Sequence, residues 1–308
     1  MEQTQYIFPS AEVTRADKSK SPMVALESTV ITHGLPYPQN LQLARDMEAT
    51  VRRAGAIPAT VGVIDGKIKV GLTDEELSQL AQGRNNIKIS RRDLAAAIAR
   101  KANGGTTVAG TMHTAAASGI RVFATGGIGG VHRENPFDVS PDLRALSDIP
   151  MIVVCAGAKA ILDLPATLEY LETAGVPVIG YKADEFPAFY SRTSGLQVSE
   201  RLASTADIAD FAMNPWGLAL RSSVLVTNPV PEMDAIPRAE IEPIIERASK
   251  EAREKKIHGQ ALSPFLLQRV NELSSKRSMR ANLALLINNA RLAADIAIAL
   301  ASLRNKRS

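Results

Sequence analysis

The sequence has 308 residues, of which 45% are hydrophobic and 22% are charged, and its formal net charge at pH 7 is +4. These values are typical of a globular protein with a sizeable core, and they exclude disordered and collagen-like chains. The longest apolar runs, such as residues 151–158, are much shorter than the roughly 20 residues that a membrane helix needs, so we expect a cytoplasmic protein without membrane or signal segments.

Regular structure is expected after a polar N-terminal segment. Residues 1–20 lack hydrophobic periodicity and predict a flexible arm. Residues 23–29 are typical of a buried strand. Apolar side chains at four-residue steps from Leu43 to Val51 then predict a helix that Gly55 can end.

Two local signals follow. Asp65 and Gly66 lie between the alternating apolar residues of 61–70, which predicts a two-residue hairpin. Thr73 and Glu76 have the spacing of a capping box and predict the start of a helix.

From residue 88 onward, strand and helix patterns alternate. The expected strands are residues 87–90, 106–110, 121–127, 151–157, 176–181 and 223–229. The region after residue 237 is expected to be largely helical. This alternation predicts an α/β fold with a mixed, mostly parallel sheet, and the absence of a linker or repeat predicts a single domain over residues 21–308.

Ligands of open α/β sheets bind at the carboxyl ends of the strands, so polar residues just after the apolar runs are candidates for a site. Glu27 directly follows a buried run, where burial would raise its pKa towards that of a general acid. Lys159 follows another run through three small residues and could act as an amine nucleophile. On pattern alone, Glu27 could equally be a loop cap, and Lys159 a solvated surface charge.

Several further residues suit a phosphorylated substrate. The glycine-rich residues 125–137 could offer backbone amides to an anion, although the dinucleotide and P-loop fingerprints both fail. Lys88, Arg91 and Arg92 could bind a phosphate, or pair with the adjacent Asp93.

A hard cation is a further candidate ligand. Asp138, Ser140 and Asp142 offer oxygen ligands, and one carboxylate plus waters would suit Mg²⁺ or Mn²⁺. The four histidines have no metal-binding spacing, which argues against zinc.

The sequence also resembles a known family. The words ALESTVITHGLPYPQN, KISRRDL, TTVAGTM, VFATGGIGGVHR, FDVSPDL, VVCAGAKAILDL, TNPVPE and NLALLINNA occur in the order found in the pseudouridine-5′-phosphate glycosidase family, also called indigoidine synthase A-like. They extend over roughly residues 25–290.

The resemblance implies a three-layer α/β/α sandwich, commonly a homotrimer, with one Mn²⁺ ion per subunit. It makes Glu27 the proton donor, Lys159 the covalent nucleophile and Asp138 the metal ligand. The implied substrate-binding residues are Lys88, Val108, Ser140, Pro141, Asp142, Thr125 and Asn289. This chain departs from the family in the short loop 134–136, next to the metal ligand.

The implied reaction is the reversible cleavage of the carbon–carbon bond of pseudouridine 5′-phosphate, giving uracil and ribose 5-phosphate through a lysine imine, in the lyase class of enzymes. An aldolase-like enzyme that uses a lysine imine is the first alternative. The sequence pI of about 9.2 also suggests an RNA-binding module. Because the basic residues are interspersed with acids, we expect small-molecule substrates and no nucleic-acid partner.

Overall fold

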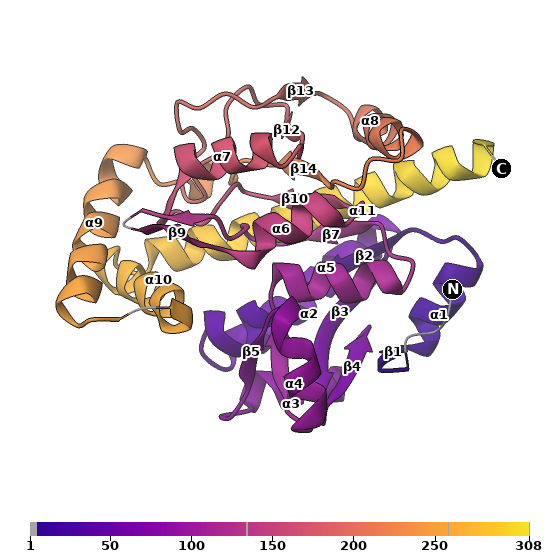
Figure 1. Ribbon diagram of the computed structural model, residues 1–308, viewed down its shortest axis with the longest axis horizontal. Coiled ribbons are helices and arrows are strands. Elements are labelled where there is room, and N and C mark those ends of the chain that lie inside the picture. Colours follow the sequence, from indigo (N-terminus) through magenta and orange to yellow (C-terminus); the bar gives the residue numbers. More distant parts are fainter. Residues whose placement is uncertain (1–4, 134, 258, 308) are drawn as a thin grey trace.

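The computed structural model describes residues 5–133, 135–257 and 259–307, and it confirms the predicted α/β class (Figure 1). The strands are β1 (Ile7–Pro9), β2 (Met23–Leu26), β3 (Ile57–Ile64), β4 (Lys67–Val70), β5 (Ile87–Ile89), β6 (Gly104–Thr106), β7 (Val122–Ala124), β8 (Val131–His132), β9 (Asn135–Val139), β10 (Ile152–Cys155), β11 (Leu162–Asp163), β12 (Val178–Tyr181), β13 (Glu200–Leu202) and β14 (Val224–Thr227). The α-helices are α1 (Ala11–Lys18), α2 (Gln39–Ala54), α3 (Asp74–Gln82), α4 (Leu94–Ala99), α5 (Val108–Ala117), α6 (Pro141–Asp148), α7 (Leu164–Thr173), α8 (Thr205–Gly217), α9 (Arg238–Glu254), α10 (Leu262–Leu273) and α11 (Arg277–Arg307).

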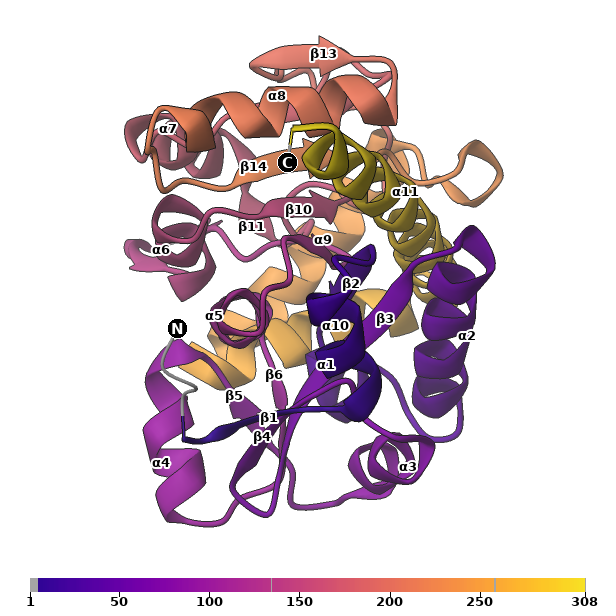
Figure 2. The same ribbon diagram turned by 90° about the vertical axis from the view of Figure 1, so that its right-hand side faces the viewer.

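One mixed sheet runs through the molecule in the spatial order β1, β4, β3, β2, β7, β10, β14, β12, β13, with β6 beside β3 and β5 beside β6. Its paired strands are parallel except where β3 meets β4 and β6. Helices α2, α8 and α11 lie on one side of the sheet, and α5, α6 and α7 lie on the other (Figure 2). This arrangement is the predicted α/β sandwich with a mostly parallel sheet.

The register of the central strands aligns the residues that follow them. The paired residues, from β2 through β7 and β10 to β14, are Leu26, Ala124, Val154 and Val226. All four are buried, and this pairing fixes which residues follow them at the carboxyl ends of the strands. The residues after Leu26 and Ala124 therefore lie side by side at one edge of the sheet, and they are Glu27 and Thr125.

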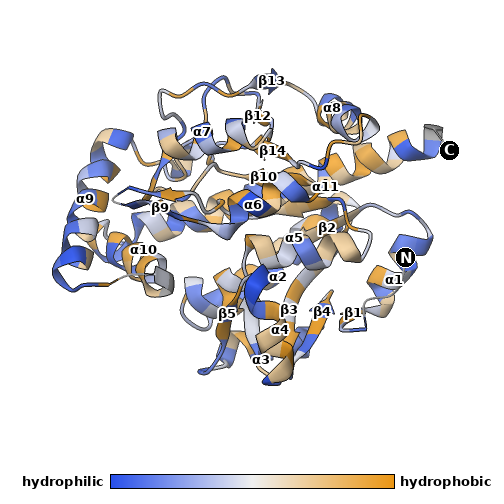
Figure 3. Ribbon diagram, in the orientation of Figure 1, coloured by the Kyte–Doolittle hydropathy of each residue, from blue (hydrophilic) through white to orange (hydrophobic). Residues whose placement is uncertain are grey.

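The long helix α11 packs along the sheet and forms much of the core. It contacts β2, β7 and β10, and Leu285, Ala293 and Ile296 are among its fully buried residues. Figure 3 shows apolar residues along α11 and the strands, whereas α9 is largely polar. Within the described residues, α11 is long and apolar enough by composition to cross a membrane, although its apolar residues do not form one continuous run in the sequence. Because 56% of the most apolar 18-residue stretch of α11 is buried inside the protein, we interpret α11 as a core helix.

The N-terminal prediction was wrong where the structure tests it. A strand, β1, pairs in parallel with β4, and the helix α1 follows it, with Val13 and Ala16 buried. Ser10 caps α1 by accepting a hydrogen bond from the backbone N–H of Val13 at 3.2 Å. The partner strand β4 is distant in sequence, so local periodicity could not indicate this pairing. Residues 1–4 of the expected arm lie outside the described residues.

Most other local predictions are confirmed. Helix α2 ends at Gly55, which has a left-handed backbone with φ of +97°. Strands β3 and β4 form the hairpin around Asp65 and Gly66, and Thr73 with Glu76 forms the capping box of α3.

Two boundaries differ from the prediction. Strand β6 ends at Thr106, and α5 begins at Val108, because the Thr107 side chain caps that helix. The glycine-rich segment contains the short strands β8 and β9 instead of one open loop, and residue 134 of the short 134–136 loop lies outside the described residues.

Candidate active site

A cavity of about 590 Å³ lies at the carboxyl ends of the central strands. This size is typical of sites for small molecules. Glu27, Lys88 and Lys159 line it together, as do Gly126 and Gly127. The rest of the lining comes from the turn Val30–Gly34, from Phe189 and Tyr190, and from α10 and the first half of α11. The structure thus brings together both predicted catalytic residues and one predicted substrate-binding residue.

Glu27 is a buried carboxyl group at the end of β2, and 7% of its surface is exposed. Burial raises its pKa, while the charge of Lys159 and a hydrogen bond from the Thr125 hydroxyl to Oε1 partly oppose that effect. A carboxyl group with a raised pKa can hold a proton near neutral pH and donate it to a bound substrate. This environment favours the general-acid interpretation of Glu27 over the loop cap.

Lys159 is positioned by the tight turn after β10. Its backbone N–H donates to the carbonyl of Ile128 at 3.1 Å, which ties this turn to the glycine-rich segment. Gly157 has a φ of +88°, and a Cβ at that position would lie 2.1 Å from the carbonyl oxygen of Pro187. Glycine at position 157 is therefore required by close backbone packing, and the Lys159 side chain lines the cavity.

Lys88 lies in the short strand β5 and lines the same cavity. Burial lowers the pKa of Lys88, and the charge of Lys159 lowers it further. Repulsion from the second ammonium group in the cavity is therefore one cause of the lowered pKa of Lys88.

Thr125 and Asn289, which the resemblance implied as substrate contacts, lie behind the cavity wall. Both are fully buried, and neither is among the residues that line the cavity. The Thr125 hydroxyl donates to Glu27, and the Asn289 side chain donates to the Thr125 carbonyl at 2.9 Å.

The other four residues that the resemblance implied as substrate contacts lie at the starts of α5 and α6 and do not line the cavity. They are Val108, Ser140, Pro141 and Asp142. Asp142 is buried, and its two carboxylate oxygens accept backbone N–H groups of Ala109 and Gly129 at 2.9 Å each. It therefore joins α5 to the glycine-rich segment. Its charge also acts on Glu27 and Lys88, which places it close to these two residues of the cavity.

Asp138 lies in β9 and is partly buried. Its charge acts on His132, and among the described residues no group of three His, Cys, Asp or Glu residues is arranged to hold a metal. A single carboxylate fits a hydrated Mg²⁺ or Mn²⁺ ion, since such ions keep several waters. It does not fit a site built only from protein ligands.

Sequence reasoning missed the far wall of the cavity. Phe189 has a left-handed backbone with φ of +61°, which is rare for a bulky residue, and its ring meets Tyr190 edge to face at 4.8 Å. His33 and Asn282 also line the cavity. His33 belongs to the loop after β2, so its position at a strand end was a usable signal. Nothing local in the sequence marks Phe189 or Asn282.

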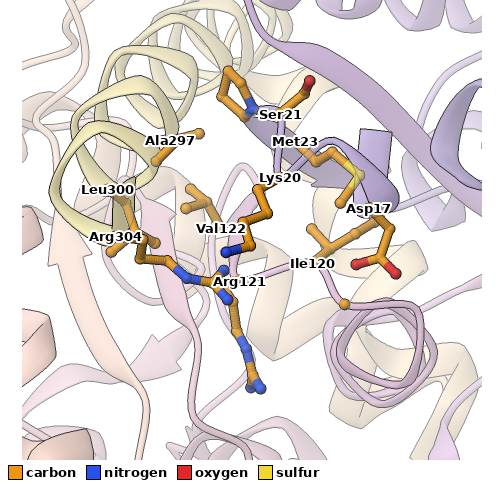
Figure 4. Close-up of a pocket in the computed structure, with 13 residues that line it drawn as sticks. Asp17, Lys20, Ser21, Met23, Ile120, Arg121, Val122, Ala297, Leu300 and Arg304 are labelled. Atoms are coloured by element: carbon orange, nitrogen blue, oxygen red, sulfur yellow. The ribbon is translucent and has the colours of Figure 1, made fainter. Parts of the chain in front are cut away.

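A smaller hollow of about 60 Å³ lies at the opposite edge of the sheet (Figure 4). Met23 and Val122, the first residues of β2 and β7, line it together with Lys20, Arg121 and Asp17. Because parallel sheets bind ligands at their carboxyl ends, the larger cavity is the candidate active site.

Comparison with known proteins identifies the family of this chain. The sequence matches the family described as indigoidine synthase A like protein over residues 12–299. It is 53% identical to a pseudouridine-5′-phosphate glycosidase of Geobacillus kaustophilus, covering 95% of this chain and 98% of that protein. It is 56% identical to one of Solibacter usitatus, covering 93% and 96%.

Two solved structures are also similar. The prealnumycin C-glycosynthase AlnA in complex with ribulose 5-phosphate aligns with a TM-score of 0.91 and 40% identity, over 98% of this chain and 99% of that one. An indigoidine synthase A-like protein from Thermotoga maritima aligns with a TM-score of 0.88 and 36% identity, over 96% of each chain. The chain therefore belongs to the indigoidine synthase A-like family, as the resemblance in sequence predicted.

Proposed function

We propose that this protein is a pseudouridine-5′-phosphate glycosidase, which reversibly cleaves pseudouridine 5′-phosphate to uracil and ribose 5-phosphate. The observation that carries the proposal is a buried carboxyl group, Glu27, in one cavity with an amine nucleophile, Lys159. The names of relatives that are 53% and 56% identical over nearly their full length support the substrate. The bound ribulose 5-phosphate of the C-glycosynthase supports a five-carbon sugar phosphate.

The chemistry explains why an acid and an amine replace the usual two carboxylates. Ordinary glycosidases protonate a leaving oxygen between a pair of carboxyl groups. Here the bond to be broken joins C1′ to C5 of uracil, and carbon is a poor leaving group. The lone pair of the lysine nitrogen drives this cleavage, because it forms a double bond to C1′ as uracil leaves, which gives an imine.

Each step can be assigned to one of the two residues. The Lys159 amine bonds to C1′ as the C1′–O4′ bond breaks, and O4′ takes the proton of Glu27. The nitrogen then loses a proton, C5 of uracil gains one, and the C1′–C5 bond breaks to leave the imine and free uracil. Water adds to the C=N bond and releases ribose 5-phosphate and the free amine. The reverse sequence joins uracil to the open-chain aldehyde.

The remaining elements of the proposal concern the surroundings of this pair. Lys88 lies in the cavity and supplies a positive charge for the substrate phosphate. Asp138 would hold one hydrated Mn²⁺ ion per subunit, and that ion would supply a positive charge near the bound sugar phosphate. We further propose a cytoplasmic homotrimer that acts in pseudouridine catabolism.

Trapping of the imine tests the proposed nucleophile. The protein is mixed with ribose 5-phosphate and borohydride, which reduces an imine to a stable amine, and the adduct is located by mass spectrometry. We expect one adduct, on Lys159, which is lost in Lys159→Ala. Lys182→Ala is the matched control, because Lys182 is an exposed lysine that follows β12, which is separated from β10 by β14 in the same sheet. Absence of an adduct in the native protein, with uracil and Mn²⁺ also tried, would contradict the covalent mechanism.

Uracil dependence separates this activity from that of an aldolase-like enzyme. We expect ribose 5-phosphate to be consumed only when uracil is present, with one pseudouridine 5′-phosphate formed for each sugar. Consumption without uracil would instead support the aldolase alternative. Salt-sensitive RNA binding that survives Lys159→Ala would support the RNA-binding alternative.

A further inference from the structure

A buried chain of hydrogen bonds connects Asn228, just after β14, to Glu27 along the carboxyl ends of the strands. Asn228 lies just after β14, and its Nδ2 donates to Oδ1 of Asn289 on α11 at 3.1 Å. Nδ2 of Asn289 donates to the carbonyl of Thr125 at 2.9 Å. The Thr125 hydroxyl then donates to Oε1 of Glu27. Every donor in the chain points towards the carboxyl group.

The chain is built from the ends of three strands and one helix. Glu27 and Thr125 are adjacent because the register pairs the residues before them. Asn289 bridges the carboxyl ends of β7 and β14 from above the sheet, with no exposed surface. Asn228 is 6% exposed, and its backbone N–H donates to the carbonyl of Cys155 at 2.8 Å. A network that is buried and paired in this way fixes the orientation of its members.

We propose that Asn289, held by Asn228, is a positioning residue that acts through Thr125 to fix the orientation and protonation of Glu27. This inference rests on the proposed function, because it assigns Glu27 the role of acid. Since the Thr125 hydroxyl donates to Oε1, Oε2 is the oxygen that carries the transferable proton. Asn289 fixes the backbone of Thr125, and so keeps that hydroxyl directed at the carboxyl group.

The alternative is direct contact of Asn289 and Thr125 with substrate, as the resemblance implied. Both side chains are fully buried and lie outside the cavity lining, so substrate cannot touch them without a rearrangement of the wall. The two roles predict different kinetics. Loss of a substrate contact raises KM, whereas loss of a positioning residue lowers kcat and alters the pH profile.

The direction of the pH effect follows from the groups that face Glu27. Burial is the largest effect on Glu27, and it raises the pKa of this carboxyl group. The charge of Lys159 and then the hydrogen bond from the Thr125 hydroxyl lower that pKa. The charge of Asp142 raises it, and the charge of Lys88 lowers it. Removal of the Thr125 hydroxyl leaves the opposing charges in place and removes one group that lowers the pKa. The pKa of Glu27 therefore rises. Because the acid must be protonated, the high-pH limb of the kcat profile moves upward.

The test measures kcat, KM and their pH profiles for pseudouridine 5′-phosphate in Thr125→Val and Asn289→Ala. We expect kcat to fall at least about ten-fold, with KM within about two-fold of the native value. The high-pH limb should move upward by about one pH unit in Thr125→Val, and less in Asn289→Ala. Thr125→Ser, which keeps the hydroxyl, should have the native kcat and the native pH profile.

Two matched controls lie next to the chain. Asn288→Ala removes an amide hydrogen bond to Pro229, one residue along the same helix. Thr227→Val removes a buried threonine hydroxyl, which donates to Ile179, at the end of β14. We expect both to keep the native pH profile.

Three outcomes would overturn the inference. They are an Asn289→Ala variant that behaves like Asn288→Ala, a shift confined to Thr125→Val, and a rise in KM with the native kcat and pH profile. If Asn289→Ala does not fold, the same readouts apply to Asn228→Ala at the outer end of the chain. Borohydride trapping on Lys159 should persist in every variant. Loss of trapping in the native protein would instead contradict the proposed function.

Discussion

Replacement of Asp142 by asparagine tests whether this residue is part of the scaffold or a contact for substrate. Both of its oxygens accept a backbone N–H at 2.9 Å, from Ala109 and Gly129, and 5% of the residue is exposed. Asparagine offers one acceptor oxygen, so its NH₂ group would face a backbone donor. The loss of one charge-assisted bond and the unpaired donor should cost about 2–4 kcal/mol.

The expected shift in melting temperature follows from the length of the chain. For 308 residues, the entropy of unfolding is about 0.65 kcal/mol per degree, so Asp142→Asn should lower Tm by about 3–6 °C. Circular dichroism during thermal unfolding measures this shift. Asp148→Asn is the control, because Asp148 is a partly exposed partner of Arg144, and its loss should lower Tm by less than about 2 °C. A native Tm with a ten-fold higher KM would refute the scaffold role and favour substrate contact.

Three further predictions concern buried groups. The folded state raises the pKa of Glu27 above 4.5, so the stability of the native protein should fall as pH rises from about 4.5 towards that raised pKa. Measured by urea unfolding, Glu27→Gln should therefore gain more stability relative to the native protein at pH 8 than at pH 5. Gly127→Ala places a Cβ 2.6 Å from the Phe189 ring, so it should lower the free energy of unfolding by about 1–3 kcal/mol in guanidinium. Gly217 has open space around it, so the control variant Gly217→Ala should not destabilise the protein. Burial raises the pKa of Cys155 to about 12, so iodoacetamide should label it at pH 8 only after denaturation, and labelling of the folded protein would contradict its burial.

The sequence alone determined the features that depend on neighbouring residues. Short buried runs flanked by glycine predicted the strands, and capping and turn residues predicted α3 and the hairpin around Asp65. The polar residues at the ends of those runs pointed to Glu27 and Lys159, because parallel strands place their carboxyl ends at one edge. Family resemblance then supplied the chemistry of the pair.

Only the tertiary structure decided what surrounds that pair. The cavity wall formed by Phe189, α10 and the first half of α11 is distant in sequence from both catalytic residues, and no local pattern predicts such contacts. The pairing of β1 with β4 was hidden for the same reason. The placement of Asn289 behind Thr125 depends on how α11 packs across the strand ends. Local pattern can indicate which residues are polar at a strand end, but only long-range packing and register determine which of them face the substrate and which hold the others in place.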